Sequence, residues 1–159
     1  MQELAELVEE HGTFERLFLE HQELILKERW REALELLKKL RRQLEIHILE
    51  EEEILLPVYK SRAGSPPGGS PQQFRLEHNK MRHLLNSYVN RERNLTWSYN
   101  SNALDVIDLI EEQSAFKHLM VHHDQRERMF LYRWLDDRTS LGEKLDMIHQ
   151  IEQMRLQYA

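Results

Sequence analysis

The chain has 159 residues, of which 40% are hydrophobic and 31% are charged, and its formal net charge is −6 at pH 7. One domain of this size can bury a substantial core, and no apolar run is long enough to cross a membrane. The acidic balance excludes a general nucleic-acid-binding surface. Cysteine is absent, which excludes thiolate metal sites and, with an amino terminus unlike a signal peptide, favours the cytoplasm. Nine histidines stand out, because histidine is the commonest protein metal ligand.

Residues 2–59 predict two helices. Glu, Leu, Lys, Arg and Gln dominate this half of the chain, and glycine and proline are missing between Gly12 and Pro57. A single straight helix of this length would be roughly 80 Å long, which exceeds the width of a compact domain. We therefore expect a bend at the charged residues 27–29, with helices over residues 2–26 and 30–59.

A segment rich in glycine, proline and serine, residues 61–71, divides the chain into two halves. After it, the composition predicts helices over residues 72–96 and 102–137. The bend between them falls at residues 98–102, a polar cluster of the kind that favours turns and helix N-caps.

The carboxyl-terminal residues predict a further helix. Ser140 and Glu143 have capping-box spacing, and Leu141, Leu145, Ile148 and Ile151 are expected on one side. The expected organisation is a bundle over residues 1–137 and an amphipathic helix over residues 138–159, packed on the bundle or on a partner in a homodimer. The predicted fold class is all-α, an up-down-up-down four-helix bundle with an extra short carboxyl-terminal helix.

In each of the four long helices, ligand-type residues interrupt an apolar stripe of heptad-like spacing. In the second and fourth helices, a histidine and a glutamate occupy successive stripe positions, four residues apart. These residues are His11 on the first helix, His47 and Glu51 on the second, His78 on the third, and His123 and Glu127 on the fourth.

The same residues are expected at one level of the bundle. In an antiparallel helix pair, residues equidistant from the turn lie side by side. The midpoint of His11 and His47 is residue 29, and that of His78 and His123 falls between residues 100 and 101, so both midpoints lie in predicted turns. The histidines stand about 18 residues from the first turn and about 22 from the second, so all four helices bring them to a similar depth.

Buried carboxylates at this level require compensation. Burying Glu51 and Glu127 without partners would cost several kcal/mol each, and no Lys or Arg shares their stripes at that level. Two divalent cations would offset them, and the remaining charge would be met by a bridging oxide, hydroxide or other anion. Mixed histidine and carboxylate ligation suits iron, manganese or zinc.

The chain resembles the hemerythrin-like, or HHE cation-binding, family over about residues 3–137. The resemblance implies a non-haem centre of two iron ions with an oxo or hydroxo bridge, in which Glu51 and Glu127 bridge the irons. It implies His11, His47, His78 and His123 as terminal ligands. The segments that carry it are residues 47–57, residues 123–132 and the pairs Glu10-His11 and Glu77-His78.

Two departures separate the chain from the oxygen-carrying members of that family. Arg82 stands where their third helix has a second histidine, and His123-x3-Glu127 replaces their His-x4-Asp. These departures argue against reversible oxygen transport. The resemblance then favours binding of O2 or a related small oxidant, NO or peroxide, for sensing, detoxification or iron handling. The alternative is a structural or interaction bundle with a stabilising zinc ion or no metal, and an enzymatic role is left open.

Other residues carry alternatives. His118 and His122 are also four apart, and either could replace or supplement His123, although their helix face is less apolar. We expect His21 to be a core or boundary residue, and residues 50–53 to face solvent apart from Glu51. A ferritin-like oxidase would need Glu-x-x-His pairs, which the sequence lacks.

Overall fold

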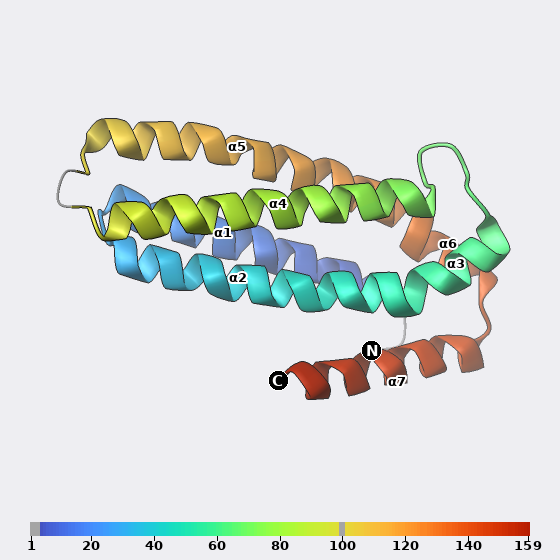
Figure 1. The fold of residues 1–159 in the computed structure, drawn as a ribbon. Helices are drawn as coiled ribbons and strands as arrows, with labels where there is room; N and C mark the ends of the chain where they lie inside the picture. The colour runs from blue at the N-terminus through green and yellow to red at the C-terminus, as the bar shows by residue number, and fades with distance from the viewer. Residues whose placement is uncertain (1–3, 99–100) are drawn as a thin grey trace.

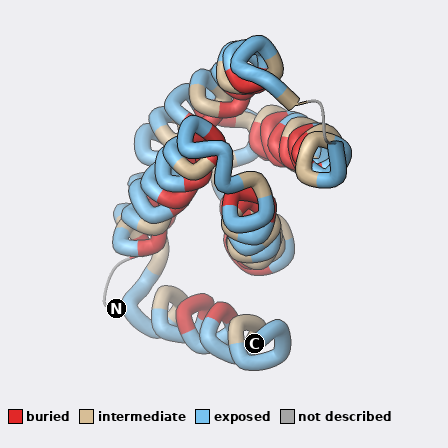
Figure 2. Tube along the Cα trace, turned by 90° about the vertical axis from the view of Figure 1, so that its left-hand side faces the viewer, coloured by how far each residue is buried: buried red, intermediate tan, exposed pale blue. Residues whose placement is uncertain are grey.

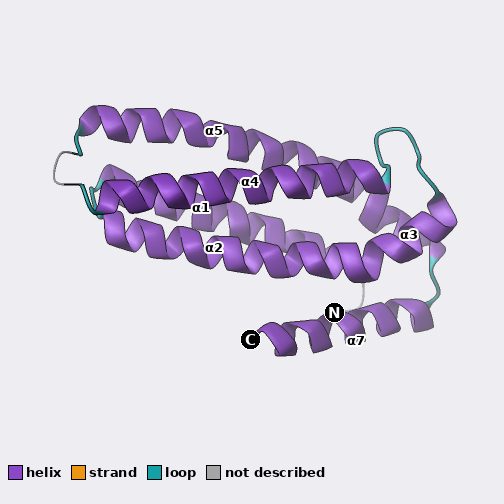
Figure 3. Ribbon diagram, in the orientation of Figure 1, coloured by secondary structure: helices purple, strands orange, loops and turns teal. Residues whose placement is uncertain are grey.

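A computed structural model describes residues 4–98 and 101–159, and within these ranges the chain forms helices and turns and no strand (Figures 1 and 3). The expected start of the first helix and part of the bend at residues 98–102 fall on residues 1–3 and 99–100, outside these ranges. The elements are the 3₁₀ helix η1 (Leu4–Glu9), α1 (Glu10–Leu26), α2 (Trp30–Glu50), the π-helix η2 (Glu51–Leu55), α3 (Leu56–Ala63), α4 (Pro71–Thr96), α5 (Ala103–Arg126), the π-helix η3 (Glu127–Tyr132), α6 (Arg133–Arg138) and α7 (Leu141–Tyr158).

Four long helical segments, called arms below, form the bundle. They are η1 with α1, α2 with η2 and α3, α4, and α5 with η3 and α6. The arm of α1 packs against α2 and α5, and α4 packs against α2 and α5, so the arms alternate in direction around one core. Figure 2 shows the buried residues on the faces that the helices turn toward one another. This arrangement confirms the predicted all-α bundle. No helix in the described ranges is both long enough and apolar enough to cross a membrane.

The turn between α1 and α2 lies at the predicted residues. Glu28 has a φ of 56°, in the left-handed region, and the N–H of Arg29 donates to the carbonyl of Leu24. A left-handed residue directly after a helix is a common way to end it, although a side chain other than glycine costs about 1–2 kcal/mol there. The neighbouring charges of the turn are solvent-exposed, which explains why residues that are not turn formers serve here.

The bend before α5 ends in a capping box. The side chain of Asn102 accepts hydrogen bonds from the N–H groups of Leu104 and Asp105, and the carboxylate of Asp105 accepts from the N–H of Asn102. Such reciprocal bonds satisfy backbone donors that a helix start otherwise leaves free. This fixes the beginning of the arm that carries His123.

The segment between α3 and α4 is pinned to the bundle. The hydroxyl of Tyr59 donates to the carbonyl of Gly69 at 2.6 Å, and Ser70 caps α4 by accepting from the N–H of Gln73. A Cβ atom on Gly69 would lie 2.4 Å from Cγ of Phe130. Glycine is therefore required at this position, because the backbone passes directly over the aromatic ring.

Two apolar clusters lie next to the predicted ligands in the core. One lies on each side of them along the bundle axis. One contains Leu4, Leu55, Tyr59, Phe74 and Leu131, and the other contains Phe14, Leu37, Leu44, Leu85 and Phe116. Close packing on both sides holds the helices at fixed separation at that level.

The last helix, α7, lies outside the four arms and contacts α2 and η2 (Figure 1). Met147, Ile148 and Ile151 are buried in the first apolar cluster. Leu141 and Leu145 are 67% and 51% exposed, so the expectation that they share the packed side is wrong. The packed stripe is rotated toward Met147 and Ile151, because α7 lies along α2 and η2 rather than across the end of the bundle.

Candidate metal centre

All six predicted ligand residues meet between the four arms. Each is at most 2% exposed. They form two groups that could each hold a metal ion, and both groups contain Glu51 and Glu127. His11 and His47 complete the first group, and His78 and His123 complete the second.

The contacts show how the glutamates connect the two groups. Glu51 lies 2.6 Å from Nε2 of His47 and 2.9 Å from Nε2 of His78. Glu127 lies 2.9 Å from Nε2 of His123 and 3.2 Å from Nε2 of His11. Each carboxylate therefore contacts one histidine of each group, which is the arrangement that a carboxylate shared between two cations requires.

Both glutamates stand at the first residue of a π-helical segment, Glu51 in η2 and Glu127 in η3. Short π segments inside α-helices occur often at functional sites. The histidine four residues earlier belongs to regular α-helix, so histidine and glutamate share one face, while the residues after the glutamate follow a wider helix. Heptad spacing carries no signal for this change.

The outer nitrogen of each histidine, Nδ1, faces a carboxylate from outside the site. Such carboxylate–histidine pairs orient the ring and raise its basicity as a ligand. These carboxylates were not predicted, because they lie beside the apolar stripes rather than on them. The pairs are His11 with Asp124 at 2.6 Å, His78 with Glu52 at 2.9 Å, His123 with Glu77 at 3.3 Å, and His47 with Glu10 at 3.5 Å and Glu50 at 3.8 Å.

The expectation that residues 50–53 face solvent apart from Glu51 is wrong for two of them. Glu50 is 1% exposed, and Glu52 holds the ring of His78. Only Glu53 of the other three is exposed. A run of four glutamates covers a full helical turn, so it necessarily supplies both the inward ligand and its outer supports.

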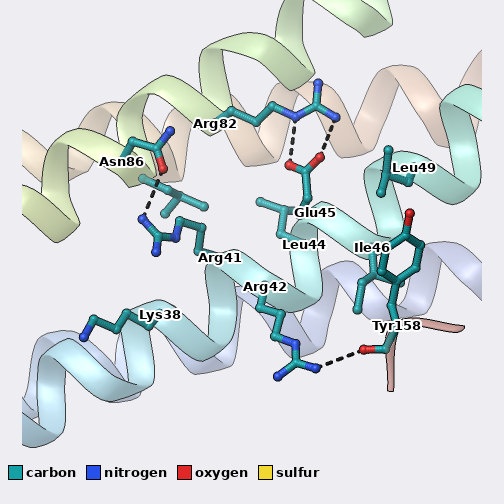
Figure 4. A pocket seen from close by; sticks show the side chains of 11 residues that line it. Lys38, Arg41, Arg42, Leu44, Glu45, Ile46, Leu49, Arg82, Asn86 and Tyr158 are labelled. Carbon is teal, nitrogen blue, oxygen red and sulfur yellow. Dashed lines mark hydrogen bonds and ion pairs between the residues drawn. The ribbon is translucent and has the colours of Figure 1, made fainter. Parts of the chain in front are cut away.

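Arginines in turn neutralise the outer carboxylates. Arg82, where the resemblance to oxygen carriers would imply a histidine, pairs with Glu45 through two nitrogens (Figure 4). Arg82 also lies 3.6 Å from Glu52. Arg82 therefore stabilises Glu52, the carboxylate that contacts Nδ1 of His78. The remaining pairs are Arg128 with Asp124, Arg126 with Glu77, and Arg155 with both Glu50 and Glu10.

The inner atoms fit bound cations. Nε2 of His11 and Nε2 of His47 lie 3.0 Å apart, and when both rings donate from Nδ1 to carboxylates these two nitrogens face each other as lone pairs. Both oxygens of Glu127 and one of Glu51 have no hydrogen-bond partner. Donors about 2.0–2.2 Å from a divalent cation and at right angles lie about 3 Å apart, so these contacts have the spacing of ligands that share an ion.

The charges inside the site are strongly coupled. Burial lowers the pKa of His123, but the charge of Glu127 and the close contacts with Glu127 and Glu77 outweigh it and raise this pKa to about 9. Burial raises the pKa of Glu127, but the charge of His123 and the close contacts with His123 and His11 hold this pKa well below the usual range. Without a cation, protons balance the carboxylates, so metal binding has to displace them.

Tyr132 is a further buried group that was not predicted. Its hydroxyl donates to Glu51 at 2.7 Å. Burial and the nearby charges of Glu51 and Glu127 raise its pKa well above the ordinary value. The phenol therefore stays protonated and fixes the orientation of the Glu51 carboxylate.

The remaining histidines lie elsewhere. His118 and His122 are exposed on the outer face of α5, and His83 and His149 are also exposed. His21 is buried, as expected, but in a separate polar cluster where Nε2 lies 2.7 Å from Glu92 and where Gln113 also donates to Glu92. The structure thus places His123, and neither alternative on its helix, among the inward groups.

Comparison with known proteins identifies the family of this chain. The sequence matches the family described as Hemerythrin HHE cation binding domain over residues 2–135. Neither the curated proteins nor the solved structures give a match. The matched residues include all six inward ligand-type side chains, and the buried His/Glu groups fit metal binding. The chain therefore belongs to the hemerythrin HHE cation-binding domain family.

Proposed function

We propose that this protein binds two iron ions between its four arms, and that the centre binds O2 or a related small oxidant such as NO or peroxide. The proposed ligands are His11, His47, Glu51, His78, His123 and Glu127. The observation that carries the proposal is the sharing of Glu51 and Glu127 between two histidine pairs. One ion would need only one such pair, so the second pair argues for two ions.

The donor set supports iron. Four imidazoles and two carboxylates suit iron, manganese or zinc, and family membership favours iron among them. Six protein side chains leave coordination positions free on two ions, and two irons supply redox chemistry toward small oxidants. The proposed role is sensing, detoxification or iron handling, and the absence of cysteine suits the reducing cytoplasm.

The surrounding side chains would orient and shield the ligands. The ring of Phe14 lies 5.5 Å from that of His47, and the ring of Phe74 lies 6.2 Å from that of His123. These apolar rings exclude water from the inner nitrogens. Tyr132 holds one oxygen of Glu51, which leaves the other directed at His78.

A second function is favoured by the complete burial of the site. Structural metal sites are closed, whereas reactive sites keep an open position, and all six side chains here are at most 2% exposed. A single zinc ion that only stabilises the bundle is therefore the alternative.

Elemental analysis with optical spectroscopy separates the two functions. The protein is stripped of metal, reconstituted anaerobically with Fe²⁺ or Zn²⁺, and desalted. The proposed function predicts two irons per chain and near-ultraviolet absorption that changes on exposure to O2 or NO. Preferential binding of one zinc, or iron without any spectral response to either gas, would instead support the structural role.

A further inference from the structure

The last helix reaches the metal centre although it lies beyond the residues that match the family. That match ends at residue 135, and α7 begins at Leu141. Arg155, near its end, donates from Nε to Glu50 at 2.6 Å and from Nη2 to the other oxygen of Glu50 at 3.1 Å. The same Nη2 contacts Glu10. One guanidinium therefore joins a carboxylate of α2 to one of α1.

These two carboxylates face the outer nitrogen of His47. Nδ1 of His47 lies 3.5 Å from Glu10 and 3.8 Å from Glu50. His47 is the one site histidine whose Nδ1 has no hydrogen-bond partner within the described ranges. Its ring thus faces two carboxylates at distances longer than a hydrogen bond. These two carboxylates repel each other unless a cation lies between them.

We propose that Arg155 is a positioning residue of the metal centre, which keeps Glu10 and Glu50 beside His47 and so makes α7 part of the site. With both carboxylates in place, Nδ1 is directed outward and Nε2 toward Glu51, at 2.6 Å. The inference rests on the proposed function, in which His47 binds metal.

The position of α7 does not depend on Arg155 alone. Met147, Ile148 and Ile151 are buried in the core. At the carboxyl-terminal end of α7, Arg42 of α2 donates to the main-chain carbonyl of Tyr158 at 2.9 Å (Figure 4). Support of His47 and attachment of α7 can therefore be separated by mutation.

The test uses the full chain stripped of metal and titrated with Co²⁺, whose visible spectrum reports both affinity and ligand geometry. Arg155→Met is expected to weaken Co²⁺ binding about 10–100-fold, the usual cost of losing an outer support of a histidine ligand, and to alter the cobalt spectrum. Two matched controls loosen α7 without touching Arg155: Arg42→Met and Ile151→Ala. Both are expected to keep the affinity within about twofold and the spectrum unchanged, although Ile151→Ala lowers the melting temperature.

A double-mutant cycle checks the route. If Arg155 acts through Glu50, then Arg155→Met and Glu50→Gln together cost clearly less than the sum of their separate effects. Unchanged affinity and spectrum in Arg155→Met would overturn the inference, and so would an equal loss of affinity in Ile151→Ala. Failure of the unmutated protein to bind Co²⁺, Fe²⁺ or Zn²⁺ would instead overturn the proposed function.

Discussion

Glu51 and Glu127 are the residues on which the site depends most. Both are fully buried, and no arginine or lysine within the described ranges forms an ion pair with either. A carboxylate in such surroundings costs several kcal/mol unless positive charge is close. Protons on the neighbouring histidines supply that charge when no metal is bound, and metal ions would supply it otherwise.

Glu127→Gln tests this dependence. The amide removes a negative charge and one of the two shared oxygens, so we expect the reconstituted protein to bind at most one iron per chain instead of two. Elemental analysis of the desalted protein measures this. Glu53→Gln is the matched control, because Glu53 is exposed on the same kind of helix and does not face the site. Two irons retained by Glu127→Gln would contradict a shared carboxylate.

At the scale of the element, the helix faces that carry the ligands follow from the sequence. Four-residue spacing predicts His47 with Glu51 and His123 with Glu127 on inward faces. It leaves His118 and His122 open as alternatives to His123, and the structure places these two on the exposed face of α5. The outer carboxylates and the π-helical segments carry no periodic signal. Glu77 directly precedes His78 and Glu52 directly follows Glu51, so spacing alone predicts that both face solvent.

Alanine substitutions at two glycines, Gly69 and Gly12, test how closely the helices and loops pack. Gly69→Ala would drive a Cβ atom into Phe130, whereas Gly12→Ala in α1 meets nothing within 4 Å. We expect Gly69→Ala to destabilise the fold by about 1–3 kcal/mol. Gly12→Ala is expected to stabilise it by about 0.5–1 kcal/mol, because it gains helix propensity on an exposed face. Urea unfolding at fixed metal content measures both, and equal effects of the two would refute the close approach at Gly69.

The polar cluster around His21 is a contact between elements that sequence could not predict, since its partner Glu92 is 71 residues away. Both side chains are fully buried. Glu92→Leu leaves His21 and Gln113 without their shared acceptor, and we expect a loss of about 1–3 kcal/mol in the free energy of unfolding. Because His21 lies about 15 Å along α1 from His11, metal content should stay unchanged. A loss of metal without a loss of stability would show that the cluster belongs to the site.

At the scale of the whole molecule, folding, protons and metal are linked. The bundle, its turns and the common level of the six inward residues could be predicted, because they follow from periodicity and chain breaks. The face of α7 that packs on the bundle could not be predicted, since a helix with apolar residues on more than one side can pack in more than one rotation about its axis. Its contact through Arg155 joins a segment outside the family match to the four arms.

This linkage predicts a pH dependence for the metal-stripped protein. The folded-state pKa of His123 is raised to about 9, above an unfolded value of about 6.5. Its contribution to stability is therefore fully present below about pH 6.5 and is lost as the pH rises through 9. We expect the urea midpoint to fall between pH 6.5 and 9.5, and to fall much less in Glu127→Gln. A midpoint that rises over this range would contradict protonated histidines in the metal-stripped fold.

The central claim is that Glu51 and Glu127 are shared between two metal ions, each also bound by two histidines. Crystals of the iron-reconstituted protein, measured on both sides of the iron absorption edge, test it most directly. Two anomalous peaks are expected between the four arms, one beside His11 and His47 and the other beside His78 and His123, both in contact with the two glutamates. A single peak, or a peak held by other residues, would contradict it.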